Sequence, residues 1–270
     1  MKLIVKRIIG VCRMKIERRS RWDGKWWPVN QFLMWVEDYY WRVKGYEIIE
    51  CIGDSHVAVF RRLNWEYPQL RVRYRTVSVL GATAYGLAKS SSKTKAKEKY
   101  ETHLARKNVG NHILIMLGEV DCSYLVWALS EKKAVSADLI LQKSLKAYCD
   151  YLSALESSGL KIIVCSAPIP TVEDGIKNPE YISIRDNITA TQIEKTNLTL
   201  SFNRSVKHFC EKSMIRFLDF DEDAINPSTG LVSEAFKNIG CVDHHYNEKH
   251  FSSVIYKKMV DEGQLTSYLL

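Results

Sequence analysis

The sequence predicts an α/β protein, built as a three-layer α/β/α sandwich around a mostly parallel, five-stranded sheet. Two observations carry this prediction. Short apolar runs alternate with segments of helical periodicity, and most of these runs are continuous, as in strands buried on both faces. The chain has 270 residues, of which 46% are hydrophobic and 26% charged, so it is long enough to bury a full core. We expect an N-terminal extension over residues 1–45 and the α/β domain over 46–270.

Five apolar runs are expected to form the strands. The second alternates, whereas the third and fourth are continuous and therefore typical of central, buried strands. In chain order they are "YEIIECIG" (46–53), "RVRYRTVSVLG" (71–81), "HILIMLG" (112–118), "LKIIVCSAP" (160–168) and "MIRFLDF" (214–220).

Helices are expected between these strands. The clearest one begins after Ser136, a favourable N-cap, and runs through "ADLILQKSLKAYCDYLSALESS". Its larger apolar residues recur at helical spacing and fall mostly on one face. They are Leu139, Leu145, Tyr148, Leu152 and Leu155. Further helices are expected over 92–106, over 187–212 and from about Asn247 to the end of the domain.

The N-terminal extension differs in composition from the rest of the chain. Residues 1–44 hold eleven Lys and Arg against four Asp and Glu, and they include five of the seven tryptophans. Phe32, Trp35, Val36 and Tyr39 share one face of a predicted helix. The simplest interpretation is an extra helix packed on the core, with its basic side chains in solvent. A weak contact with a membrane surface is the main alternative, and no nucleic-acid partner is expected.

Cysteine usage and hydropathy indicate the compartment. The seven cysteines are scattered, odd in number and contain no C-x-x-C pair, which favours reduced thiols over a disulfide framework or a zinc site. No apolar run approaches the roughly 18 residues of a membrane span, and no signal-peptide cleavage pattern follows the N-terminus. We therefore expect a cytoplasmic protein. The sequence leaves its oligomeric state open.

Three polar clusters interrupt the apolar pattern. "GDSH" (53–56) ends the first strand, "GEVDC" (118–122) ends the third, and "DHHYN" (243–247) precedes the last helix. A tight turn, a pair of solvated carboxylates and a helix cap would explain each cluster separately. Taken together in a doubly wound fold, they bring a serine, acids and histidines to one edge of the sheet. Nucleophilic acyl chemistry needs these residue types.

At these residues the chain resembles the SGNH hydrolases, also called GDSL esterases and lipases, over roughly residues 46–260. "IGDSHV" resembles the family's first block, with Ser55 matching the nucleophile. "LGATAYG" gives Gly81 as the match to the glycine whose N–H helps to bind the oxyanion. "LGEVDC" follows the third strand as the third block does, and "VDHHYN" resembles the block that carries the catalytic Asp and His. The resemblance implies a flavodoxin-like sheet. Other segments are similar to a bacterial subgroup associated with surface-polysaccharide loci.

Two departures from the family pattern matter. The third block usually reads Gly-x-Asn-Asp, and its Asn side chain donates to the oxyanion, whereas here Val120 stands in that position. The last block usually reads Asp-x-x-His, whereas here a single residue separates Asp243 from His245. We expect His245 to be the base, because "HYN" then leads into the helix as in the family. His244 is the alternative.

The resemblance implies a serine esterase or deacylase that forms an acyl-serine, with an O-acetyl group of a carbohydrate as the expected substrate. Ser55, His245 and Asp243 form the expected catalytic set, and no metal or cofactor is expected. A carbohydrate O-acyltransferase and a weakly catalytic glycan-binding module are the alternatives. Residues expected to line the oxyanion or substrate site are Gly81, Asp54, His56, Glu119, Asp121 and His244. Each of these also has a plain structural interpretation, as a turn, capping or packing residue.

Overall fold

In the computed structural model, residues 36, 39–106, 109–110, 112–175, 188–239 and 243–260 are described. Five parallel strands form one sheet in the order β2-β1-β3-β4-β5. This confirms the predicted three-layer architecture, although each strand is shorter than its apolar run. The strands are β1 (Glu47–Gly53), β2 (Val72–Ser78), β3 (His112–Met116), β4 (Lys161–Cys165) and β5 (Arg216–Leu218).

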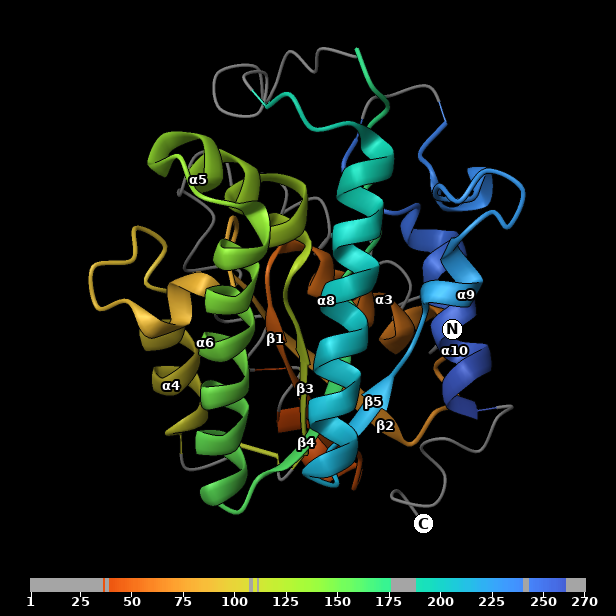
Figure 1. Cartoon of the computed structure of the whole chain (residues 1–270). Helices are drawn as coiled ribbons and strands as arrows, with labels where there is room; N and C mark the ends of the chain where they lie inside the picture. Colours follow the sequence, from red (N-terminus) through yellow and green to blue (C-terminus); the bar gives the residue numbers. More distant parts are fainter. Residues whose placement is uncertain are drawn as a thin grey trace, which may run out of the picture.

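Helices cover both faces of the sheet (Figure 1). One face packs against α4 (Ala96–Leu104), α5 (Val126–Lys133), α6 (Ala137–Ser157) and α8 (Gln192–Lys212). The other packs against α3 (Val59–Glu66), α9 (Asp221–Ala224) and α10 (Glu248–Val260). Short turns complete the connections, namely η1 (Ser55–Ala58), η2 (Tyr85–Ala88), η3 (Asp121–Leu125) and η4 (Glu234–Phe236).

The central strands are apolar throughout because each one contributes side chains to two hydrophobic cores, one on each face of the sheet. In β3, Ile113 and Ile115 belong to the core beneath α6 and α8, whereas Leu114 and Met116 belong to the core beneath α3 and α10. Successive side chains of a strand point to opposite faces, so a strand covered on both sides has no polar alternation. This accounts for the continuous run in the sequence.

Two helix starts follow local capping chemistry. The Ser136 hydroxyl accepts the N–H of Leu139 at the start of α6, as the sequence predicts. Leu139 itself is 46% exposed, so it does not share the buried face of the other apolar residues of α6, and that part of the prediction was wrong. The helix expected from residue 187 begins at Gln192, because Thr191 and Glu194 form a reciprocal capping box there.

Most of the N-terminal extension lies outside the described residues, and so do four of its five tryptophans. The fifth, Trp41, lies in a helical segment and is buried, whereas Val36 and Tyr39 are exposed. The Trp41 carbonyl accepts the N–H of Tyr46, just before β1. Among the described residues, no helix is both long and apolar enough to cross a membrane.

A buried ionic cluster lies in the sheet and was not expected from the sequence. The Glu50 carboxylate of β1 forms a bidentate ion pair with Arg75 of β2. It also lies 2.8 Å from Nε2 of His103 and accepts the N–H of Gly110 at 3.0 Å. Burial alone would raise the pKa of Glu50, but the hydrogen bonds from Arg75 and His103 outweigh it and lower the pKa to about 2.

The substitution Glu50→Gln is expected to destabilise the protein by about 3–5 kcal/mol, because it removes the carboxylate charge that pairs with the buried Arg75 guanidinium. It should also change how the free energy of unfolding depends on pH in the acid range. A carboxyl group whose pKa is lower in the folded state stabilises the fold at high pH. This stabilisation is lost as the pH falls from about 4.5 to about 2. Urea unfolding at pH 7 and across the acid range measures both effects.

Asp150→Asn is the matched control, because Asp150 pairs with Lys146 on the exposed face of α6. Exposed pairs at this spacing contribute only about 0.3–0.5 kcal/mol. Equal effects of the two substitutions would contradict a structural role for the buried cluster.

Candidate active site

The strand order defines where a site can form. From β1 the chain first adds β2 on one side and then β3 on the other, so the topology reverses between β1 and β3. In doubly wound sheets of this order, ligands bind beyond the carboxyl ends of the strands at that switch point. The "GDSH" turn follows β1, and the "GEVDC" loop follows β3. Two of the three predicted clusters are therefore neighbours.

The turn after β1 is held by close packing and a cap. A Cβ atom on Gly53 would lie 2.1 Å from the carbonyl oxygen of Met116 in β3, so the close approach of these strands requires glycine. Asp54 is fully buried, and its Oδ1 accepts the N–H of His56 at 2.9 Å, which caps η1. Ser55 is the first residue of η1 and is 7% exposed, at the carboxyl edge of the sheet.

The loop after β3 fixes the neighbouring "LGATAYG" segment. Gly118 has a φ of +123°, and a Cβ there would lie 2.4 Å from Cε1 of Phe202. Asp121 then begins a π-helical turn, and its two carboxylate oxygens accept the N–H groups of Ala84 (2.7 Å) and Tyr85 (3.0 Å). Burial raises the pKa of Asp121 to about 6. Asp121 thus positions the segment that begins at Gly81, whose φ is +67°.

The loop before α10 joins an acid to a histidine despite its unusual spacing. Oδ1 of Asp243 lies 2.8 Å from Nδ1 of His245 and also accepts the backbone N–H of His245 at 3.0 Å. The corresponding distance to Nδ1 of His244 is 3.6 Å, too long for a hydrogen bond. The carboxylate therefore orients His245 rather than His244.

The surroundings of Asp243 keep it ionised. Burial alone would raise its pKa, but hydrogen bonds with His245 lower it to about 2. Asn238 Nδ2 donates to its Oδ2 at 3.2 Å, and the Thr171 hydroxyl donates to its backbone carbonyl at 2.7 Å. Neither residue was anticipated. Thr171 lies 72 positions away in sequence, and Asn238 has the appearance of an ordinary loop residue.

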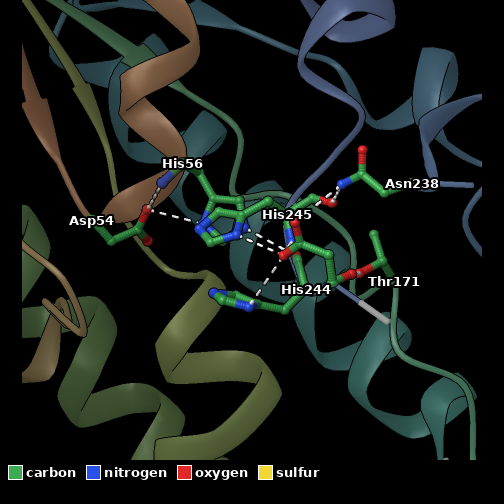
Figure 2. A network of polar contacts seen from close by, with 7 residues as sticks. Asp54, His56, Thr171, Asn238, His244 and His245 are labelled. Carbon is green, nitrogen blue, oxygen red and sulfur yellow. Dashed lines mark hydrogen bonds and ion pairs between the residues drawn. The ribbon is translucent and has the colours of Figure 1, made fainter. Parts of the chain in front are cut away.

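His56 connects the serine turn to the histidine loop (Figure 2). Its Nδ1 lies 3.1 Å from Oδ1 of Asp54, and its Nε2 lies 3.2 Å from the backbone carbonyl of His244. Burial lowers the pKa of His56, but the negative charges of Asp54 and Glu119 outweigh this effect and raise the pKa to about 9. At neutral pH His56 is therefore an imidazolium whose two N–H groups donate to the two loops.

The three histidine rings lie close together beside the turn that bears Ser55. The His56 ring centroid is 4.7 Å from that of His245 and 5.6 Å from that of His244. Since His56 directly follows Ser55, the third predicted cluster reaches the same edge as the first. Within the described residues, the Ser55 hydroxyl forms no hydrogen bond with His244 or His245. Such bonds are often long in free enzymes and shorten when substrate binds.

The remaining predicted residues lie around this centre. Glu119 is buried, at 2% exposure, and its charge acts on His56. Val120 is also buried and offers no side-chain donor to an oxyanion. The structure thus assembles Asp54, His56, Glu119, Asp243, His244 and His245 into one polar region, with Asp121 supporting the Gly81 segment.

Comparison with solved structures defines the fold. An acetylxylan esterase from Geobacillus stearothermophilus, in a variant form, superposes with a TM-score of 0.52 at 16% identity over 79% of this chain and 94% of that chain. A protein from Streptococcus pneumonia, provisionally described as a platelet activating factor, gives a TM-score of 0.51 at 14% identity over 86% and 91%. A GDSL-like lipase from Bacteroides thetaiotaomicron gives 0.46 at 14% identity over 80% and 89%. The fold is that of the SGNH hydrolases. No protein-family model and no curated protein sequence matches the chain.

The substitution Asp121→Asn tests the support of the Gly81 segment. An amide has only one acceptor oxygen, so at least one of the N–H groups of Ala84 and Tyr85 loses its partner. Hydrogen bonds to a charged group contribute about 1.5–3 kcal/mol. Amide exchange at Ala84 and Tyr85 should therefore accelerate roughly ten- to hundredfold, as measured by mass spectrometry or NMR. Unchanged exchange at both amides, with the Asp150→Asn variant as reference, would contradict this role.

Proposed function

We propose that the protein is a serine esterase that removes an acyl group from an ester through an acyl-serine intermediate. The observation that carries the proposal is the Asp243–His245 pair, at 2.8 Å, beside the turn that bears Ser55. Carboxylate contact with Nδ1 fixes the imidazole tautomer that presents Nε2 as a base. A serine hydroxyl is a weak nucleophile until such a base is adjacent.

In the proposed reaction, Ser55 Oγ attacks the acyl carbon while its proton passes to Nε2 of His245. The tetrahedral oxyanion is stabilised by backbone N–H groups, for which Ser55 and Gly81 are the candidates. The ester bond then breaks, and the alcohol leaves with the proton from His245. Water then reacts with the acyl-serine in the same way. It gives its proton to His245 and attacks the acyl carbon. The acid is released, and Ser55 regains its proton from His245. The ionised Asp243 stabilises the imidazolium in both steps.

The absence of a donor side chain at Val120 limits the expected rate. Loss of one oxyanion donor costs on the order of 10²–10³ in rate. The two backbone donors would carry the stabilisation alone, so we expect activated acetyl esters to react more readily than unactivated ones. An O-acetyl group on a carbohydrate is the substrate we propose, in keeping with the sequence resemblance and with the acetylxylan esterase among the structural neighbours.

Hydrolysis of 4-nitrophenyl acetate and of acetylated xylo-oligosaccharides tests the reaction. Ser55→Ala should abolish turnover, and Asp243→Asn should lower kcat by about 10⁴, because the imidazole tautomer is no longer fixed. His245→Ala should lose activity to a far greater degree than His244→Ala. The control is Ser153→Ala, which changes an exposed serine on α6. Full activity in Ser55→Ala would exclude the proposed nucleophile.

A second candidate is a glycan-binding module without efficient catalysis. Val120 and the unformed hydrogen bond between Ser55 and the histidines favour it. This function predicts that wild type and Ser55→Ala bind acetylated oligosaccharide equally well in calorimetry while neither releases acetate. Release of acetate by the wild type, together with its loss in Ser55→Ala, would exclude the binding module in favour of the enzyme.

A further inference from the structure

Three histidines converge at the carboxyl edge of the sheet in a way that acyl-serine chemistry does not require. One ring nitrogen from each of His56, His244 and His245 lies within 4.8 Å of the others. The proposed reaction uses one base, His245, oriented by Asp243. The other two rings are buried, whereas the His245 side chain is 27% exposed. The three histidines are therefore largely shielded from solvent, and the exposed part of the group is the ring of His245.

The carboxylates around the group are arranged as in metal sites. Histidines that bind a metal through one ring nitrogen usually donate the other N–H to a carboxylate or a carbonyl. Here Nδ1 of His56 contacts Asp54 at 3.1 Å, and Nδ1 of His245 contacts Asp243 at 2.8 Å. In both rings the contact with the carboxylate is made by Nδ1, so Nε2 is the ring nitrogen left for a metal ion. Glu119, which is buried, adds a third negative charge, near His56.

We propose that His56, His244 and His245 form a binding site for a divalent transition-metal ion of the Zn²⁺ class, and that the bound ion inhibits the acyl-serine reaction. Three imidazoles with an open fourth position are a common ligand set for this ion. The inhibitory consequence rests on the proposed function, because it requires that His245 be the base. The binding itself does not.

Loading the site requires small, definable movements. Zn–N bonds of about 2.0 Å in tetrahedral geometry place the nitrogens about 3.3 Å apart, so the most separated pair must close by up to about 1.5 Å. His56 gives up its contact with the His244 carbonyl and releases a proton to solvent. The metal then occupies Nε2 of His245, which can no longer accept the proton of Ser55. The ion is thus a competitor of catalysis and not a cofactor.

Titration of chelator-treated protein with Zn²⁺ in a calorimeter tests the binding. We expect one ion per chain, and affinity losses of at least about 100-fold in His56→Ala, His244→Ala and His245→Ala, since changes outside the ligand set alone cost 10- to 100-fold. His208→Ala, which removes an exposed histidine of α8, is the control and should bind as wild type does. Circular dichroism confirms that each variant is folded.

Two further measurements leave all three histidines in place, and they separate this inference from the proposed function. Co²⁺ in the wild-type protein should show the intense visible absorption of a tetrahedral nitrogen-ligated ion. Ser55→Ala should bind Zn²⁺ with unchanged affinity although it is inactive. If wild type hydrolyses acetyl esters but Zn²⁺ neither binds nor inhibits, this inference is wrong and the esterase stands. If Zn²⁺ binds at the histidines but no ester is cleaved, the site stands and the esterase does not.

Discussion

The parallel pairing of β1 with β3 is the constraint on which the site depends. It places Gly53 against the Met116 carbonyl so closely that no side chain fits, and it aligns the ends of both strands at one edge of the sheet. The serine turn and the "GEVDC" loop leave these strands at the same level. Because the strand order reverses at this pair, the helices that follow β1 and β3 pack on opposite faces of the sheet, and polar side chains can gather between the two strand ends.

Hydrogen bonds to charged side chains hold the loops of the site together. Asp121 binds two amides of the Gly81 segment, Asp243 binds His245, and His56 joins the serine turn to the histidine loop. Each contact involves a buried or half-buried ion whose partners compensate for its lost hydration. The arrangement concentrates three histidines and several carboxylates within a few ångströms. Such a concentration serves a proton-transfer site and would equally attract a metal cation.

The sequence predicted the fold well because the signals are local and strong. Continuous apolar runs identify central parallel strands, and Ser136 identifies a helix start. Errors occurred where tertiary context decides: Leu139 points to solvent, and the capping box of Thr191 and Glu194 sets the start of α8. The buried Glu50–Arg75–His103 cluster was missed because charged residues in an alternating strand normally indicate a solvent-facing side.

The site was predictable only in part, for the same reason. Residues in short polar motifs could be named, including Asp243 and His245, but the sequence could not decide between His244 and His245 with a spacing that departs from the family pattern. The distances to Asp243 distinguish them. Long-range supports such as Thr171, and the link from His56 to the His244 carbonyl, depend on loop positions that no local pattern encodes.

The central claim is that Ser55 is an activated nucleophile. The most direct measurement is mass spectrometry of the protein after reaction with a fluorophosphonate, with the modified peptide sequenced. The account predicts one adduct per chain, located on Ser55 and greatly reduced in His245→Ala. A folded wild-type protein that forms no adduct, or forms it on another residue, would contradict the account.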